Sequence, residues 1–105
     1  MKIIYIASPY TLGDVAANVS VQIEAAHTIL DMGQVPYWPL ESHFLHMYRQ
    51  RPYEEWLKKD LTILSRVDIV LRLPGESSGA DREIAEAKTL GITVALGWDE
   101  LKALV

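Results

Sequence analysis

Residues 68–98 read DIVLRLPGESSGADREIAEAKTLGITVALGW, which places a helical pattern between two apolar runs. The runs at 68–74 and 91–98 are short, rich in Val, Ile and Leu, and bounded by Gly or Pro, as buried strands are. Between them, Gly79 to Leu90 carry apolar side chains at the spacing of an amphipathic helix. A strand, a helix and a second strand in this order predict a parallel pair, because parallel neighbours need a long crossover connection.

The rest of the chain repeats this alternation. Apolar, β-rich runs at residues 2–7 and 34–40 predict two further strands, and Pro36 puts the second at a sheet edge or at a strand start. Residues 14–32 have helical spacing, and Gly33 is expected to cap that helix. Helices are also expected at residues 53–67 and 99–105, and residues 41–52 are expected to be irregular.

The order β-α-β-α-β-α-β-α predicts a small doubly wound α/β fold of the Rossmann or flavodoxin-like kind. Its parallel sheet is expected to have four to five strands, with helices on both faces. A chain of 105 residues suits one domain, residues 1–105, and is too short for two. In such a fold, ligands are expected at the carboxyl ends of the strands.

Composition and charge exclude several classes of protein. The chain has no cysteine, so it has neither a disulfide framework nor a thiolate zinc site, and nothing argues for secretion. Its first residues, MKIIYIASPY, are apolar too briefly for a signal peptide, and no run approaches the roughly 20 apolar residues that span a bilayer. A net charge of −4 disfavours binding to nucleic acid polymers. We therefore expect a cytoplasmic protein that contacts neither membranes nor nucleic acid polymers.

Two helices each direct one carboxylate toward the predicted core. At about 100° per residue, Glu83 falls inside the apolar stripe of its helix, between Ala87 and Leu90. Asp60 falls in the middle of the apolar arc of the helix 53–67. The other charged residues of that helix are expected to face solvent: Glu54, Glu55, Lys58, Lys59 and Arg66. Either acid alone is consistent with a half-exposed carboxylate bonded to backbone amides, but the two together indicate a site, because inward acids are rare without a use.

Paired carboxylates suit the cleavage of a bond at an oxocarbenium-like centre. One acid attacks or stabilises the anomeric carbon and the other manages the proton of the leaving group, and Tyr5 lies on the first strand. Before Glu83 lies the small-residue turn GESSGA, which leads into a helix N-terminus. Its free N–H groups and the hydroxyls of Ser77 and Ser78 are suited to an anion such as a phosphate, although ordinary helix capping explains the same residues.

These residues resemble the nucleoside 2-deoxyribosyltransferase-like superfamily, and in particular its small bacterial and phage members. The resemblance rests on IYIASPYT at the start, on Asp60 within WLKKDLTILSRVDIVLRLPG, and on SSGADREIAEAKTLGI. It extends over nearly the whole chain. The superfamily also contains hydrolases that cut the N-glycosidic bond of nucleoside 5′-monophosphates.

The resemblance implies a role for each of these residues. Glu83 matches the nucleophile that forms a covalent (deoxy)ribosyl–enzyme intermediate, and Asp60 matches the acid that handles the leaving or incoming base. Tyr5 matches a tyrosine that orients the nucleophile. Ser77 stands where the monophosphate hydrolases have a phosphate-binding serine, which favours a 5′-phosphorylated substrate, whereas Thr11 stands where those hydrolases carry a phosphate-binding arginine. The chemistry needs no cofactor and no metal.

Further residues are expected to contact the substrate: Ser8, Pro9, Thr11, Asn18, His43, Ser78 and Gly79. They come from the first strand–helix loop, the edge of the helix 14–32, the segment 41–52 and the turn before Glu83. His43 and His46 invite a metal interpretation, but no third ligand lies near them in the sequence, so no metal site is expected.

A homodimer or larger homo-oligomer is expected. The final residues, WDELKALV, are apolar, and one small subunit is not expected to bury all of Leu101, Ala103, Leu104 and Val105. Members of the superfamily also build each active site across a subunit interface.

Three functions remain open from the sequence. The first is cleavage of a (deoxy)nucleoside or its 5′-monophosphate, with water as acceptor in a hydrolase and a second base as acceptor in a transferase. The second is a nucleotide-binding module without catalysis, in which Glu83 and Asp60 bind ribose hydroxyls. The third is a purely structural protein.

Overall fold

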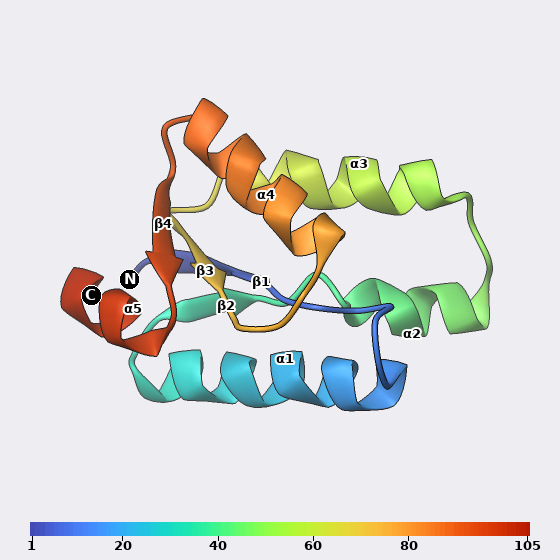
Figure 1. The fold of residues 1–105 in the computed structure, drawn as a ribbon, viewed down its shortest axis with the longest axis horizontal. Coiled ribbons are helices and arrows are strands. Elements are labelled where there is room, and N and C mark those ends of the chain that lie inside the picture. The colour runs from blue at the N-terminus through green and yellow to red at the C-terminus, as the bar shows by residue number, and fades with distance from the viewer.

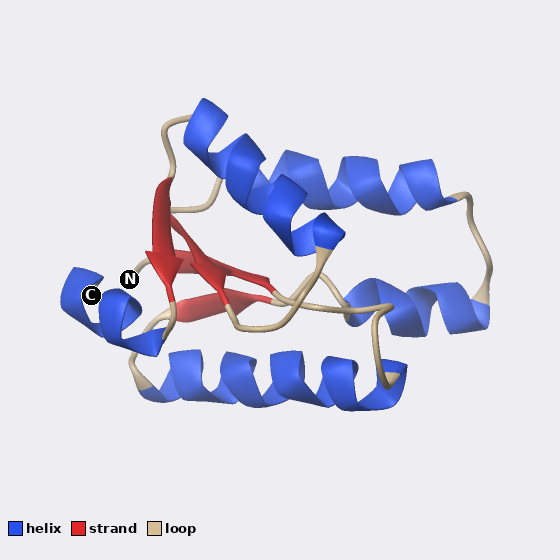
Figure 2. Cartoon of the chain, in the orientation of Figure 1, coloured by secondary structure: helices blue, strands red, loops and turns tan.

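A computed structural model describes residues 1–105 as alternating strands and helices. The elements are β1 (Ile3–Ala7), α1 (Val15–Asp31), β2 (Val35–Tyr37), α2 (Glu41–Tyr48), α3 (Tyr53–Leu64), β3 (Ile69–Arg72), α4 (Ser78–Thr89), β4 (Thr93–Leu96) and α5 (Trp98–Leu104). The four strands form one parallel sheet in the order β2-β1-β3-β4, and helices cover both of its faces (Figure 1, Figure 2). The predicted α/β fold is confirmed.

Alternate residues of β1 enter two separate cores. Ile4 and Ile6 pack with residues of α1 and α5 on one face of the sheet, whereas Tyr5 and Ala7 pack with residues of α3 and α4 on the other. Figure 1 shows these two pairs of helices on opposite sides of the sheet. All four side chains are fully buried. Because side chains alternate along a strand, Tyr5 is directed at the two helices that carry the inward acids.

Both ends of α1 are capped, and the cap at its C-terminal end is the one that the sequence predicts. The carboxylate of Asp14 accepts hydrogen bonds from two backbone N–H groups of the first turn, at 2.9 and 3.2 Å. After the last turn, Gly33 has φ 78° and its N–H donates to the carbonyl of Leu30 at 2.9 Å. The N–H of the next residue donates to the carbonyl of Ile29 at 3.1 Å, which completes a Schellman motif. Gly33 thus ends the helix, directly after the C-cap residue.

Residues 41–52 are not irregular throughout, so this prediction was wrong. Glu41–Tyr48 form α2, which lies beyond the carboxyl ends of the strands (Figure 1). Ser42 is the one buried residue of this helix. Its large apolar residues are 49 to 89% exposed: Phe44, Leu45, Met47 and Tyr48. Because they form no buried stripe, the helical period leaves no trace in the hydrophobic pattern.

The closing helix, α5, is buried through one of its apolar residues, and a single subunit does not bury the rest, as expected. Leu101 of α5 is fully buried in the core on the α1 side of the sheet. A single subunit therefore covers this one side chain of the four, whereas Ala103 is exposed. Leu104 and Val105 remain 41% and 42% exposed.

The strand order places a topological switch at the centre of the sheet. β1 and β3 are the inner strands, and the chain leaves β1 toward β2 on one side and returns to β3 on the other. The segments that follow these strands therefore diverge at one edge, where doubly wound folds bind their ligands. No helix of the structure has both the length and the apolar character needed to cross a membrane.

Candidate active site

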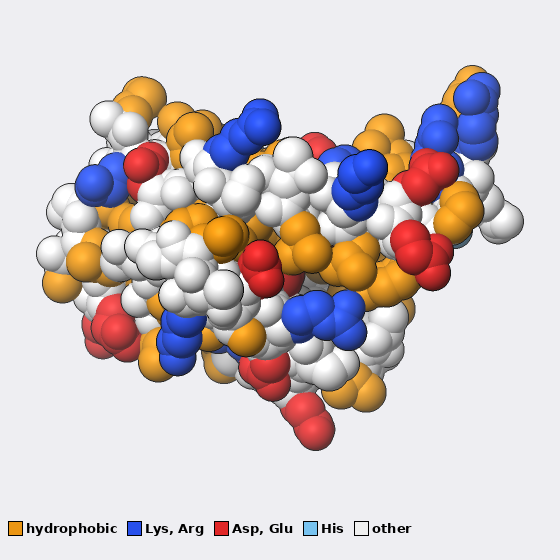
Figure 3. Space-filling view, turned by 90° about the horizontal axis from the view of Figure 1, so that it is seen from above, with side chains coloured by type: hydrophobic (Ala, Val, Ile, Leu, Met, Phe, Trp, Pro, Cys, Tyr) orange, Lys and Arg blue, Asp and Glu red, His pale blue; other side chains and the backbone are white.

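A cavity of about 450 Å³ opens at the carboxyl ends of the inner strands. Its walls come from the loop after β1, from α2, from the first turns of α3 and from the turn that leads into α4. Figure 3 shows the face of the molecule over α3 and α4, where hydrophobic side chains lie among acidic and basic ones. Many of the residues selected from the sequence line this cavity: Ser8, Thr11, His43, Asp60, Ser77, Ser78, Gly79 and Glu83.

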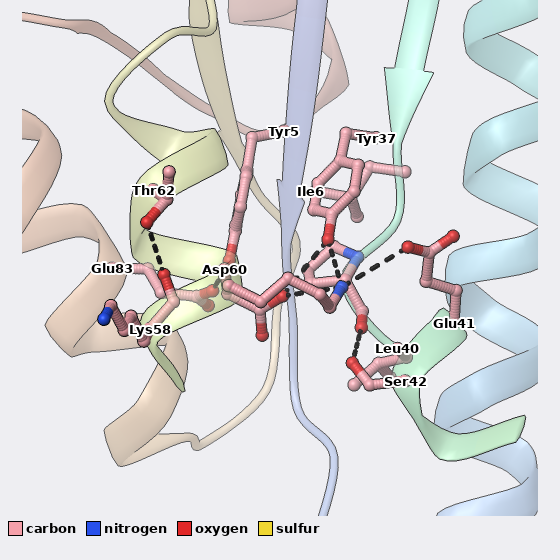
Figure 4. A network of polar contacts seen from close by, with 12 residues as sticks. Tyr5, Ile6, Tyr37, Leu40, Glu41, Ser42, Lys58, Asp60, Thr62 and Glu83 are labelled. Carbon is pink, nitrogen blue, oxygen red and sulfur yellow. Dashed lines mark hydrogen bonds and ion pairs between the residues drawn. The ribbon is translucent and has the colours of Figure 1, made fainter. Parts of the chain in front are cut away.

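Glu83 meets Tyr5 at the wall of the cavity. The tyrosine, fully buried on β1, donates a hydrogen bond from its hydroxyl to Oε2 of Glu83 on α4 (Figure 4). The other carboxylate oxygen, Oε1, has no hydrogen-bond partner within the protein. One oxygen is thus held from behind, and the other is available to a ligand.

Burial raises the pKa of Glu83 from its ordinary value of 4.5 to about 7. The negative charge of Asp60 acts in the same direction, whereas the hydrogen bond from Tyr5 and the charges of Arg72 and Arg82 oppose the shift. Burial, together with the charge of Glu83, also raises the pKa of Tyr5, so the tyrosine stays protonated and remains a donor.

Asp60 lies in a second polar network, formed by α3, β2 and α2. Its Oδ1 accepts a hydrogen bond from the hydroxyl of Tyr37 at 3.2 Å and contacts the ammonium of Lys59 at 3.2 Å (Figure 4). The Lys59 ammonium also donates to the Tyr37 hydroxyl at 2.5 Å and to Glu41 at 3.3 Å. Burial raises the pKa of Asp60, and the charge of Lys59 holds that rise back.

The sequence analysis did not place two residues, Lys59 and Tyr37, in this network. Lys59 was expected to face solvent, yet its side chain is only 26% exposed. The helical wheel places it away from the core of α3, but β2 and α2 supply acceptors there that a wheel does not contain. Tyr37 was not selected at all. Its signal is its register, because Tyr37 pairs with Tyr5 on the neighbouring strand and so shares a sheet face with it.

The turn before α4 combines helix capping with a place on the cavity wall. Ser77 is the N-cap of α4, and its hydroxyl accepts a hydrogen bond from the N–H of Ala80 at 3.0 Å. Arg72 braces the turn from β3, since its guanidinium donates to the carbonyl of Gly75 at 2.8 Å and pairs with Asp81 at 3.1 Å. Backbone N–H groups at such a helix start are suited to an anion.

Pro9 and Asn18 do not line the cavity. Asn18 instead holds the loop after β1, because its amide donates to the carbonyls of Tyr10 and Leu12 at 2.9 and 2.8 Å. Pro9 lies against Gly75, where a Cβ would come within 2.7 Å of the proline ring. Both residues shape the cavity walls from outside.

The histidines of α2 have partners within the protein. His43 shares a hydrogen bond of 2.8 Å with the hydroxyl of Tyr10, and Nδ1 of His46 accepts from the indole N–H of Trp56 at 2.9 Å. Nowhere do three His, Cys, Asp or Glu side chains come together in a group that could hold a metal ion.

Gln22 is a further residue of the cavity wall that the sequence analysis did not select as functional. It is 1% exposed, and its amide donates to Ser8 at 2.9 Å and to the carbonyl of Ile6 at 3.1 Å. Its side-chain oxygen accepts from the N–H of Leu40 at 3.0 Å. Gln22 could have been found in the sequence, because it is an uncharged polar residue within the apolar stripe of α1.

Comparisons with known proteins agree with this architecture. The sequence model of a family described as a domain of unknown function (DUF7768) matches residues 2–96. The chain belongs to this family. No curated protein matches it. Among solved structures, a 2-deoxyribosyltransferase from Bacillus psychrosaccharolyticus is similar with a TM-score of 0.67 and 23% sequence identity, over 88% of this chain and 69% of that one. This likeness concerns the fold.

Proposed function

We propose that this DUF7768 protein cleaves the N-glycosidic bond of a (deoxy)nucleoside or a (deoxy)nucleoside 5′-monophosphate through a covalent glycosyl–Glu83 intermediate. The observation that carries the proposal is the Glu83 carboxylate, held by Tyr5 through one oxygen and open to the cavity through the other. Asp60 lines the same cavity. A fold neighbour that is a 2-deoxyribosyltransferase adds support.

The reaction has two displacement steps. In the first, Oε1 of Glu83 bonds to the anomeric carbon while the carbon–nitrogen bond breaks, and the base leaves with the bonding electron pair. Asp60 gives that base a proton or a hydrogen bond. In the second, water or another base attacks the anomeric carbon and gives up a proton to Asp60, while the bond to Glu83 breaks and its carboxylate is regenerated. Water yields a hydrolase, and a second base yields a transferase.

In this proposal, the 5′-phosphate of a substrate binds beside the turn at Ser77. The start of α4 offers backbone N–H groups there, and Arg82 and Arg51 also line the cavity. The two guanidiniums are partly engaged, Arg82 with the hydroxyl of Tyr53 at 3.4 Å and Arg51 with Glu55 at 3.1 Å. These cations favour a 5′-phosphorylated substrate, even though Thr11 replaces the arginine of the similar hydrolases.

A homo-oligomer is part of the proposal. The exposed apolar residues of α2 form a surface of the kind that subunit interfaces cover, and α2 also lines the cavity through His43 and His46. A second copy that packs on this helix would lie beside the active site.

Incubation of the pure protein with a panel of nucleosides and their 5′-monophosphates tests the proposal. Chromatography should detect free base with the wild type and none with Glu83→Gln. Addition of a second base distinguishes transfer from hydrolysis, because only a transferase yields the exchanged nucleoside. Ligand binding with neither free base nor, after a second base is added, an exchanged nucleoside would instead indicate a nucleotide-binding module. The absence of any ligand-induced thermal shift would indicate a structural protein.

A further inference from the structure

We infer that Tyr37 and Lys59 are positioning residues for Asp60, which clamp one oxygen of its carboxylate and leave the other to meet the leaving base. The inference rests on the proposed function, because it assigns the network around one of the two inward acids. Tyr37 and Lys59 do not line the cavity, so they act on the substrate through Asp60.

The clamp is visible in the distribution of contacts over the two oxygens of Asp60. The Tyr37 hydroxyl and the Lys59 ammonium both reach Oδ1, each at 3.2 Å. Oδ2 has no hydrogen bond or ion pair within the protein and is not sealed in the interior. A carboxylate held through one oxygen cannot exchange its two oxygens by rotation without breaking both contacts. The free oxygen therefore keeps a fixed direction.

The Lys59 ammonium is itself held in place. It contacts the Tyr37 hydroxyl from β2, Glu41 from α2, and Asp60 from its own helix. An ion pair between two exposed side chains would hardly restrict their positions. The Lys59 side chain is only 26% exposed, and acceptors from three elements surround its ammonium. The ring of Tyr37 packs 5.4 Å from that of Tyr5, which limits the motion of the hydroxyl that joins the network.

The charges around Asp60 give the clamp an electrostatic effect as well. The titratable groups that act on it or respond to its charge are Lys59 on its own helix, Tyr37 on β2, Glu41 on α2, Glu83 on α4 and Tyr5 on β1. Lys59 is the only cation among them. Burial raises the pKa of Asp60 and Lys59 lowers it, so loss of the lysine charge must raise the pKa further.

The test compares Lys59→Met and Tyr37→Phe with Lys58→Met as a matched control. Lys58 precedes Lys59 on α3, is exposed, and its side chain makes no hydrogen bond or ion pair. In proteins labelled with 13C at aspartate carboxyls, NMR titration should show a higher Asp60 pKa in Lys59→Met than in the wild type. Lys58→Met should titrate as the wild type does. Asp60→Asn assigns the signal.

Kinetics provide the second measurement. We expect Tyr37→Phe and Lys59→Met to lower kcat by about 10- to 100-fold, because a misdirected catalytic group costs that much, with a much smaller change in KM. The limb of the pH–rate profile that reports Asp60 should move to higher pH in Lys59→Met. Lys58→Met should keep the wild-type kcat and profile.

The two measurements separate this inference from the proposed function. An unchanged Asp60 titration in Lys59→Met would overturn the clamp, whether or not the protein cleaves nucleosides. A raised pKa in a protein that cleaves no substrate would support the clamp and contradict the enzymatic role. In an active enzyme, wild-type kcat in both Tyr37→Phe and Lys59→Met would also overturn it. Amide spectra of each variant check that the fold is retained.

Discussion

Glu83 occupies a position in which an acid would be destabilising without a partner. Its helix turns that side of α4 toward the sheet, where Ala80 and Ala87 are buried, and its carboxylate meets the hydroxyl of Tyr5. The acid keeps a raised pKa because burial outweighs that hydrogen bond. A carboxylate in this state is poorly solvated, which suits a nucleophile that must attack an electron-poor carbon.

The first prediction concerns Glu83 in its proposed role as the nucleophile. Glu83→Gln keeps the shape of the side chain and removes the negative oxygen, so it should lower the rate of base release by on the order of 10⁴-fold or more. Circular dichroism should show that the fold is retained. Glu83→Gln with nearly the wild-type rate would show that another group attacks the anomeric carbon.

Asp60 is predicted to act on the leaving base. Asp60→Asn should slow the cleavage of substrates with poor leaving groups by about 10² to 10⁴-fold, because only those need protonation. Substrates with activated leaving groups should lose much less. The measurement is kcat for both kinds of substrate with the same enzyme preparation. An equal loss for both would indicate that Asp60 has a purely positional role.

The raised pKa of Glu83 predicts how stability depends on pH. Between its ordinary value of 4.5 and about 7, the folded protein holds a proton that the unfolded chain releases. The free energy of unfolding should therefore fall as pH rises through this window, by on the order of 3 kcal/mol from this group. Urea unfolding at several pH values measures the change.

Glu83→Gln is the matched control for that measurement, because its side chain does not titrate. Its free energy of unfolding should fall less between pH 4.5 and 7 than that of the wild type. Parallel pH dependences of wild type and variant would show that Glu83 is not the group responsible.

Among the elements, α4 joins the turn at Ser77, where we propose that a phosphate binds, to the candidate nucleophile Glu83. Ser77 begins the helix and Glu83 lies within it, so the helix sets the position of the turn relative to the carboxylate. β1 and β2 also fix the positions of site residues. Their register pairs Tyr5 with Tyr37, so the two tyrosines lie side by side behind the two acids. Each inward acid thus accepts a hydrogen bond from a tyrosine of the sheet, Glu83 from Tyr5 and Asp60 from Tyr37.

Ser77→Ala is predicted to weaken α4. The variant loses the hydrogen bond from the N–H of Ala80 to the serine hydroxyl, which should cost about 1 kcal/mol in the free energy of unfolding. Ser78→Ala is the control, because Ser78 is exposed and its hydroxyl makes no hydrogen bond in the structure. Chemical denaturation of both variants measures the difference. Equal stabilities would contradict a capping role for Ser77.

In the molecule as a whole, the cavity lies where the two halves of the sheet diverge. The order β2-β1-β3-β4 sends the loop after β1 and the turn after β3 apart at the same edge, and α2 and α3 close the space between them. The cavity wall thus combines residues from the loop 8–12 with residues of α4 that lie far along the chain.

We also predict a homodimer or larger homo-oligomer. α2 exposes Phe44, Leu45, Met47 and Tyr48, and the chain end exposes Leu104 and Val105. Burial of such residues between subunits is favourable by roughly 25 cal/mol per Å² of apolar surface. Sedimentation or light scattering at micromolar concentration should give a mass at least twice that of the chain. A monomer mass in a preparation that still cleaves substrate would contradict this prediction.

The sequence by itself determined the alternation of strands and helices and the presence of two inward acids. Both depend on local periodicity, because the helical and strand repeats decide which residues are buried. Glu83 and Asp60 could be found because each carries a charge at a position that its own helix turns toward the core.

Only the tertiary structure decided what surrounds those acids. α2 escaped prediction because its apolar residues lie on an exposed surface and form no buried stripe. Lys59 looks like a solvent-facing residue on its helix, and its acceptors come from β2 and α2. The pairing of Tyr37 with Tyr5 depends on strand register, which joins residues 32 positions apart in the chain. Such contacts follow from the packing of distant elements, and local periodicity carries no information about them.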